Sequence, residues 1–313
     1  MQDVAGKVAF ITGGGSGMGL GMAEAFTAAG MRVVIADIRR DHLDQALARL
    51  AGREVHTLLL DVADRAAMAA AAAETVQVFG KVHVLVNNAA IGFMGTVSDS
   101  SYDDWDWVMG VNLGGVFNGV REFVPRIRAQ GEGGHVVTTA SMGGLFCGGN
   151  AGVYNTSKHA VVGLMEALRE ELGPEGIGAS VFCPGLVNTN IHEAEHTRPA
   201  RYAQSGYLLK PGELAAREQF MKSQVLPAGM TPLEVGERVL RGIRHNDLYI
   251  LSHPEYETGL RERFDAILAS VPRGEPPPPP ERVAAEARVL RNRIYSDERD
   301  RKQAELAARG LAP

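Results

Sequence analysis

Tyr154 and Lys158 are the residues of this sequence that point most directly to chemistry. They stand four positions apart, so in a helix both lie on one face. A phenol with a pKa of about 10 is a poor base at neutral pH, but a neighbouring ammonium group stabilises its phenolate. Ser141, thirteen positions earlier, offers a hydroxyl that can donate to a developing oxygen anion. Singly, these residues also fit a surface lysine, an amphipathic tyrosine and a loop serine. They indicate catalysis only because of their order and because of the other motifs in the chain.

A glycine-rich turn lies near the N-terminus, between an expected strand at 8–12 and an expected helix. Its glycines Gly13, Gly17 and Gly19 follow a GxxxGxG spacing, which departs from the strict GxGxxG dinucleotide fingerprint. A loop at a helix N-terminus presents unpaired amides and the positive end of the helix dipole, which suit a pyrophosphate. A tight strand-to-helix turn without a ligand is the alternative.

Asp37 strengthens the dinucleotide interpretation. It ends the second expected strand, 24 positions after Gly13, where a carboxylate can accept hydrogen bonds from the adenosine ribose. The same carboxylate repels a 2′-phosphate, so the sequence predicts NAD, with NADP disfavoured. Arg39 and Arg40 would bind that phosphate if they turned inward, but Ile38, directly after Asp37, is not basic. A plain helix-entry residue is the alternative for Asp37.

Further residues follow the third and fourth expected strands. Asp61 and Val62 come after the third strand, and the run from Asn87 to Ala90 comes after the fourth. Ligands of open α/β sheets bind at the carboxyl ends of the strands, which is where these residues fall. Asn87 and Asn88 alone also fit turn formers that stabilise the loop.

The elements that must position these residues alternate along the chain. Strands are expected at 8–12, 33–36, 55–59, 84–87, 135–139, 179–183 and 248–251. Helices are expected at 18–29, 41–50, 64–79, 101–129, 155–172 and 231–244. Apolar strands alternating with helices predict βαβ crossovers and a sheet covered on both faces. The expected fold class is therefore α/β, a doubly wound Rossmann-type parallel sheet of about seven strands in a single domain.

We expect that domain to span residues 1–255 and a helical C-terminal extension to span 256–313. The expected parts of the extension are a helix at 257–270, a polyproline II stretch over the five prolines at 276–280, and a helix at 281–309. The last helix carries apolar residues on one stripe, Val283, Ala287, Leu290 and Ile294. The extension is then a packing arm or an oligomer contact, or else a mobile end.

Composition limits the classes of partner and compartment. The formal net charge of −5 gives no reason to expect nucleic-acid binding. No apolar run approaches the roughly 18 residues of a membrane span, and no basic and apolar leader opens the chain. The two cysteines, Cys147 and Cys183, are too few for a disulfide framework and are expected to be packing residues. We expect a cytoplasmic protein.

Taken in order, these motifs resemble those of the short-chain dehydrogenase/reductase family over about residues 5–251. The matching residues are TGGGSGMG at 12–19, Asp37, Asp61-Val62, NNAA at 87–90, Asn112, Ser141, YNTSK at 154–158 and PG at 184–185. One departure is Ala90, where the family pattern NNAG has glycine, a mild change that should not stop cofactor binding.

The resemblance implies an alcohol dehydrogenase or carbonyl reductase and assigns residue roles. Tyr154 is the implied general acid/base, and Lys158 holds the nicotinamide ribose and lowers the tyrosine pKa. Ser141 hydrogen-bonds the substrate oxygen, and Asn112 supports a proton-relay water. The implied cofactor contacts are Gly13, Ser16, Gly17, Met18, Gly19, Asp37, Asp61, Val62, Asn88, Ala89, Tyr154, Lys158, Pro184, Gly185 and Thr189.

Three stretches, at 101–127, 190–207 and 248–260, also resemble one bacterial branch of the family. This branch contains the NAD-dependent Cα-dehydrogenases of lignin β-aryl ether catabolism, which oxidise a benzylic secondary alcohol to an aryl ketone. It also holds members without a known substrate.

Residues 186–230 are expected to form the lid that selects the substrate. The lid carries side chains that suit a bulky aromatic or polycyclic alcohol, His192, His196, Tyr202 and Tyr207. Solvated histidines in a flexible loop are the alternative. No third ligand accompanies the two histidines, so no metal site is predicted.

Other activities on the same fold stay open at this point. One is an NADPH-dependent ketoreductase acting on an acyl chain or a steroid, which Asp37 disfavours. Another is a non-catalytic NAD-binding scaffold, which would have no need for Ser141. A sugar epimerase would need a large nucleotide-sugar domain that the chain lacks. By resemblance we expect a homodimer or homotetramer paired through the helices at 101–129 and 155–172.

Overall fold

The computed structural model of the protein describes residues 1–206, 211–274, 276–289 and 292–311. The chain divides into two units, Met1–His253 and Pro254–Pro313. The expected boundary, after residue 255, lies two residues beyond the one observed after His253. No helix among the described residues is long and apolar enough to cross a membrane.

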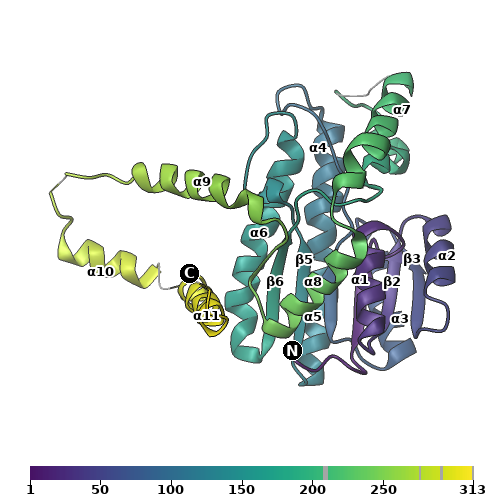
Figure 1. Cartoon of the computed structure of the whole chain (residues 1–313), viewed down its shortest axis with the longest axis horizontal. Coiled ribbons are helices and arrows are strands. Elements are labelled where there is room, and N and C mark those ends of the chain that lie inside the picture. The colour runs from purple at the N-terminus through teal and green to yellow at the C-terminus, as the bar shows by residue number, and fades with distance from the viewer. Residues whose placement is uncertain (207–210, 275, 290–291, 312–313) are drawn as a thin grey trace. The chain divides into compact units, whose positions relative to one another are not determined.

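Seven parallel strands form one sheet in the first unit, in the order β3-β2-β1-β4-β5-β6-β7 (Figure 1). The strands are β1 Val8–Thr12, β2 Arg32–Asp37, β3 Val55–Leu59, β4 Val84–Asn87, β5 Gly134–Thr139, β6 Ile177–Cys183 and β7 Tyr249–Leu251. The order reverses between β1 and β4, and a crevice for a ligand forms at such a reversal. The predicted doubly wound sheet is confirmed.

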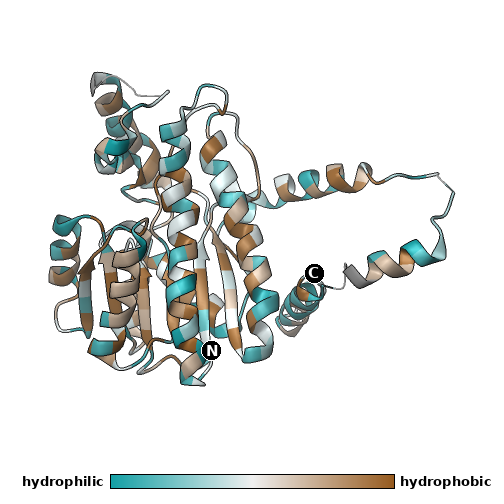
Figure 2. Cartoon of the chain, turned by 180° about the vertical axis from the view of Figure 1, so that it is seen from behind, coloured by the Kyte–Doolittle hydropathy of each residue, from teal (hydrophilic) through white to brown (hydrophobic). Residues whose placement is uncertain are grey.

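Helices cover both faces of this sheet, which explains why four of its strands are buried along their whole length. Every residue of β1, β4, β5 and β6 is buried. In Figure 2 the strands are mostly brown, whereas the helices carry teal residues on their outer sides. The helices of this unit are α1 Gly17–Ala28, α2 Arg40–Arg49, α3 Arg65–Phe79, α4 Tyr102–Met109, α5 Gly115–Gln130, α6 Gly152–Leu172, α7 Pro211–Phe220 and α8 Pro232–His245.

Helices α1 and α8 cross at a pair of glycines. A Cβ atom on Gly21 would lie 1.9 Å from the carbonyl oxygen of Pro232, and one on Gly236 would lie 2.1 Å from the carbonyl oxygen of Gly21. Only residues without a side chain allow the two backbones to come this close. The start of α8 is fixed by a capping box, in which Thr231 Oγ1 accepts a hydrogen bond from Glu234 N. This crossing holds α1, whose first turn belongs to the site described below.

The single helix predicted at 101–129 was wrong, because the helix changes its winding in the middle. Helix α4 ends at Met109, a π-helical segment spans Gly110–Gly114, and α5 begins at Gly115. A π segment is a rare single turn within an α-helix, so helical periodicity alone predicts an unbroken helix here. Asn112 lies in this segment and is fully buried.

The second unit contains three helices among its described residues, α9 Glu257–Ala269, α10 Pro280–Val289 and α11 Ile294–Ala308. The extended run predicted at 276–280 was wrong at its last residue, because Pro280 begins α10, a position that suits proline. The continuous helix predicted at 281–309 was wrong as well. Asn292 Oδ1 accepts a hydrogen bond from Ile294 N at 2.9 Å and begins a new helix. Leu290 lies outside the described residues.

Candidate active site

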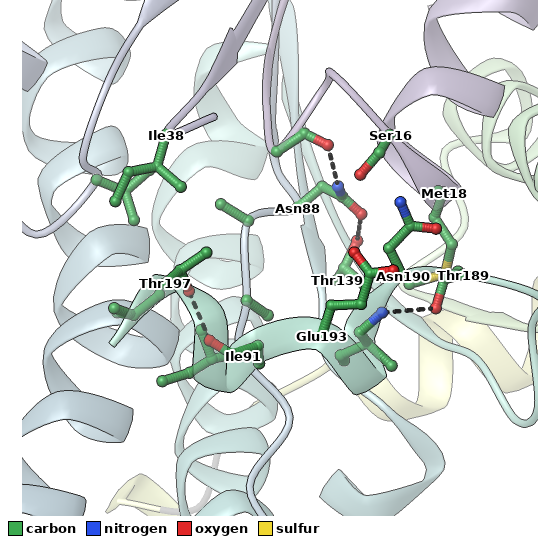
Figure 3. Close-up of a pocket in the computed structure, with 18 of the residues that line it drawn as sticks. Ser16, Met18, Ile38, Asn88, Ile91, Thr139, Thr189, Asn190, Glu193 and Thr197 are labelled. Atoms are coloured by element: carbon green, nitrogen blue, oxygen red, sulfur yellow. Dashed lines mark hydrogen bonds between the residues drawn. The ribbon is translucent and has the colours of Figure 1, made fainter. Parts of the chain in front are cut away.

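A cavity of about 310 Å³ lies along the carboxyl ends of the strands. It passes the residues that follow β1, β3, β4 and β6 and the ends of β2 and β5. Of the residues predicted to contact a cofactor, those that line it are Gly13, Ser16, Gly17, Met18, Asp37, Asp61, Val62, Asn88, Ala89, Tyr154, Lys158, Pro184, Gly185 and Thr189. Figure 3 shows Ser16, Met18, Asn88 and Thr189 around one side of it. Gly19 does not line the cavity.

The glycine-rich turn owes its shape to the missing side chains. Gly13 and Gly17 have φ angles of 61° and 49°, a region that strongly favours glycine. A Cβ atom on Gly19 would lie 2.1 Å from the carbonyl oxygen of Gly13, so Gly19 lets α1 pack against the turn. The first turn of α1 thereby presents its backbone N–H groups to the cavity, an arrangement that suits a pyrophosphate.

Asp37 is held at the end of β2 by two backbone amides. Its Oδ2 accepts a hydrogen bond from Gly15 N at 3.1 Å, and its Oδ1 accepts one from Arg39 N at 3.0 Å. The side chain is buried except for the surface that it gives to the cavity. Each carboxylate oxygen has a second lone pair, so Asp37 can still accept hydrogen bonds from ribose hydroxyls.

Asn88 joins the ends of three neighbouring strands. Its Nδ2 donates to the carbonyl oxygens of Thr12 and Gly13 at 3.1 and 3.3 Å, and its Oδ1 accepts from Thr139 Oγ1 at 3.1 Å. Figure 3 shows this side chain between the glycine-rich turn and Thr139. Asn88 therefore fixes the floor of the cavity, which is more than the turn-forming role open to it in the sequence.

Asp61 and Val62 form the wall beyond β3. Asp61 Oδ1 accepts a hydrogen bond from Ala63 N at 2.9 Å, and Asp61 Oδ2 lies 3.8 Å from Arg201 Nη2. The carbonyl oxygen of Val62 accepts from Asn118 Nδ2 at 2.9 Å, which ties this loop to α5. Val62 thus presents a fixed apolar side chain to the cavity.

Ser141, Tyr154 and Lys158 meet at the other end of the cavity. Lys158 Nζ donates to the carbonyl oxygen of Thr139 at 2.9 Å and lies 5.7 Å from the centroid of the Tyr154 ring. Ser141 Oγ accepts a hydrogen bond from Gly143 N at 3.0 Å, which leaves its own proton available for donation. Helix α6 carries Tyr154 and Lys158, and the loop after β5 carries Ser141.

Burial dominates the ionisation of this group in the cofactor-free site. It raises the pKa of Tyr154 above its usual value of 10.0, and the hydroxyl of Ser141 only partly opposes the rise. Burial also lowers the pKa of Lys158 from 10.5 to about 8. The pKa of Tyr154 is therefore shifted in the direction opposite to that expected from its lysine neighbour. The desolvation of the phenolate outweighs a cation that is itself buried.

Asn112 lies outside the lining of the cavity. Its Nδ2 donates to the carbonyl oxygen of Ile91 at 3.0 Å and to Ser157 Oγ at 3.2 Å, and its Oδ1 accepts from Ile91 N at 2.9 Å. The side chain therefore connects the π-helical segment to the loop after β4 and to α6. These contacts position the helix that carries Tyr154.

Beyond Tyr154 the cavity is bounded by an apolar cluster. Its members are Ile91, Phe93, Trp107, Val108, Val153 and Ala194, with Val111, Tyr154 and Tyr202 packed against them. Sequence reasoning missed Trp107, which is buried and lines the cavity. The guanidinium carbon of Arg198 lies 4.2 Å from the centroid of the Trp107 ring. No spacing rule links positions 107 and 198, so the sequence held no signal for this contact.

The lid residues singled out in the sequence occupy different places. Tyr202 lines the cavity, but His192 and His196 do not. The His192 ring bonds through Nδ1 to the carbonyl oxygen of Thr189 at 3.1 Å, and His196 Nε2 lies 3.0 Å from Glu218 Oε1. The two histidines therefore do not shape the substrate end as expected. Tyr207 lies outside the described residues.

Comparisons with known proteins agree with this geometry. A family model described as short chain dehydrogenase matches residues 7–200, and the chain belongs to that family. It is an NAD(P)-dependent oxidoreductase. Over 304 residues it is 40% identical to the C alpha-dehydrogenase of Sphingobium sp. strain SYK-6, covering 95% of this chain and 98% of that protein.

Two solved structures extend the comparison. A short-chain dehydrogenase/reductase from Burkholderia phymatum in complex with NAD has a TM-score of 0.80 and 37% identity, covering 89% of this chain and all of that one. The LigD-apo form from Sphingobium sp. strain SYK-6 has a TM-score of 0.71 and 38% identity, covering 86% and 99% of the two chains. These likenesses support a nicotinamide cofactor for this chain.

Proposed function

We propose that the protein uses NAD to interconvert a secondary alcohol and its ketone, with Tyr154 as the general acid/base. One observation carries the proposal. The cavity that begins at Asp37 ends at Tyr154, Ser141 and Lys158, so a dinucleotide lying along it would bring its nicotinamide to these three side chains.

Each of the three residues has a defined task in this mechanism. When bound, NAD supplies the acceptor for the hydride that leaves the carbinol carbon. The Tyr154 phenolate takes the hydroxyl proton as the carbonyl bond forms, and Ser141 donates a hydrogen bond to the same oxygen. The Lys158 ammonium favours the phenolate electrostatically. In ketone reduction, Tyr154 returns the proton.

The preference for NAD over NADP rests on Asp37. Its carboxylate faces the cavity from the end of β2 and would accept hydrogen bonds from the adenosine ribose hydroxyls. A 2′-phosphate would place a second anion beside it. The Burkholderia relative was solved with NAD, in line with this preference.

The apolar cluster supports an aryl carbinol as the substrate. Trp107, Tyr202, Ile91 and Val111 offer aromatic and aliphatic surface next to Tyr154. Flat aromatic substrates gain from stacking and from burial against such walls. The relative named C alpha-dehydrogenase, which matches nearly the whole chain, adds to this choice.

We also propose that residues 186–230 act as the lid of this site and that the protein works as a homo-oligomer. Residues of the lid that line the cavity include Asn190, Glu193 and Thr197 (Figure 3). An exposed apolar stripe on helix α9 of the second unit supports the homo-oligomer.

The decisive experiment replaces Tyr154 with Phe and follows NADH absorbance with benzylic, aliphatic and steroid alcohols. Loss of general acid/base catalysis should lower turnover by about 10²- to 10⁴-fold. The affinity for NAD, measured by fluorescence titration, should hardly change. Tyr102→Phe, on the exposed surface of α4, serves as the matched control and should keep full activity. Undiminished turnover in Tyr154→Phe would refute the proposal, and a preference for steroid or acyl substrates would refute the aryl assignment.

A further inference from the structure

Arg39 is the cation that stands beside Asp37 in the cavity wall. Its backbone N–H donates to Asp37 Oδ1 at 3.0 Å, and its side chain lines the cavity. Arg40, the next residue, does not line it. A guanidinium in this place would bind a 2′-phosphate by charge-assisted hydrogen bonds if it were free. The choice between NAD and NADP therefore depends on what holds Arg39.

Two carboxylates hold the Arg39 side chain. Asp41, in the first turn of α2, accepts from Nε at 3.1 Å and from Nη2 at 2.5 Å. Glu193, 154 positions further along the chain, accepts from Nη1 at 3.1 Å. Both partners are part of the reason why the pKa of Arg39 is raised, with Asp41 the larger cause. The Nε, Nη1 and Nη2 groups of the guanidinium thus each donate to a carboxylate.

Glu193 differs from Asp41 in its place in the fold. It belongs to a short 3-10 helical segment of the lid, Ile191–Thr197, and it lines the cavity, whereas Asp41 does not. Figure 3 shows Glu193 extending from the lid into the pocket, on the side where Ser16 and Asn88 lie. The side chain is 27% exposed, and that of Arg39 is 30% exposed. The ion pair therefore crosses the cofactor end of the cavity instead of lying on the outer surface.

We propose that Glu193 is a cofactor-selecting residue, which keeps Arg39 from a 2′-phosphate and adds a negative charge where that phosphate would lie. Asp41 and Glu193 pair with the guanidinium and Asp37 accepts from the Arg39 backbone N–H, so three carboxylates and one guanidinium give this wall a net charge of −2. The Glu193 carboxylate would repel an incoming 2′-phosphate, and it would compete with that phosphate for the Arg39 guanidinium. The inference rests on the NAD preference proposed above and assigns part of it to the lid.

The test measures binding of NAD and NADP to the full chain by isothermal titration calorimetry, without substrate. Glu193→Gln should bind NADP about tenfold more tightly than the unchanged protein, with little change for NAD. Adding Arg39→Gln should remove the gain, because the freed guanidinium is its source. Asp44→Asn removes a similar charge from the exposed surface of α2 and should change neither affinity.

The outcomes separate the two proposals. If the unchanged protein prefers NAD but Glu193→Gln gains no affinity for NADP, the role of Glu193 is wrong and the proposed function stands. A gain that persists after Arg39→Gln would also overturn it, because Glu193 would then act without Arg39. If the unchanged protein binds NADP as well as NAD, the NAD preference fails and this inference fails with it.

Discussion

At the scale of single residues, Lys158 shows that the site requires a buried positive charge. Its side chain is 2% exposed, and its ammonium group donates to one backbone carbonyl oxygen, that of Thr139. No described carboxylate pairs with Lys158, so the buried lysine keeps its charge at a cost, which appears as the lowered pKa of about 8. The same group is the cation that the Tyr154 phenolate needs. Function and stability therefore make opposite demands on this residue.

That conflict predicts a pH-dependent stability in the cofactor-free protein. Between pH 8 and 10.5 the unfolded chain holds the Lys158 proton and the folded chain releases it, so the contribution of Lys158 to the free energy of unfolding rises with pH. The full rise is about 3 kcal/mol. Lys158→Met should remove it, so the stability difference between variant and parent should shrink as pH rises. Urea titrations at pH 7.5 and 10 measure this, with exposed Lys222→Met as the control. A difference that is constant with pH would contradict the prediction.

At the scale of elements, α4 anchors the lid through Asp104. This carboxylate accepts hydrogen bonds from Ser205 Oγ at 2.6 Å and from Gly206 N at 2.9 Å. Its Oδ1 also lies 3.0 Å from Arg198 Nη1, with both side chains nearly or fully buried. Burial alone would raise the pKa of Asp104, but its hydrogen bonds, that from Ser205 first, lower it overall. Arg198 in turn covers Trp107, so one cluster fixes both the lid and the wall of the substrate end.

We therefore expect Arg198→Met to damage both stability and substrate binding. Removing one partner of a buried ion pair leaves the other uncompensated, which should lower the free energy of unfolding by about 3 kcal/mol. Because Trp107 loses its cover, KM for the alcohol should rise more than kcat falls. Arg126→Met is the matched control, since Arg126 pairs with Glu122 in a partly exposed i,i+4 bridge worth at most about 1 kcal/mol. Equal losses in the two variants would show that the cluster does not anchor the lid.

At the scale of the whole molecule, the sequence predicted the sheet well because its signals are local. Strand runs such as Val84–Asn87 and the glycine-rich turn at Gly13 each show their role in a few neighbouring residues. What the sequence missed depends on contacts between distant positions. The ion pair of Arg39 with Glu193 and the stacking of Arg198 on Trp107 join residues about a hundred or more positions apart. The π-helical segment at Gly110–Gly114 is local, but such turns are rare and helical periodicity predicts an unbroken α-helix.

The second unit carries an exposed apolar stripe that fits the proposed homo-oligomer. Helix α9 and the two residues after it bear an apolar stripe at i, i+3, i+4 and i+7 spacing, Phe264, Ile267, Leu268 and Val271. Each of these side chains is more than half exposed, and no residue of α9 is buried. A stripe of this kind matches the seam between two packed helices, and a second copy of the chain offers an identical stripe to pair with.

Leu268→Asp should therefore weaken the oligomer, because a carboxylate in such a seam would be buried without a partner. Sedimentation velocity at several concentrations should show a lower mass than for the unchanged chain. Asp265→Asn, on the same helix outside the stripe, should keep the parent mass. NAD binding should survive in both variants, since every residue that lines the cofactor cavity lies within residues 1–253. An unchanged mass for Leu268→Asp would show that the stripe is not the contact. Any oligomer would then have to form through the helices at 101–129 and 155–172.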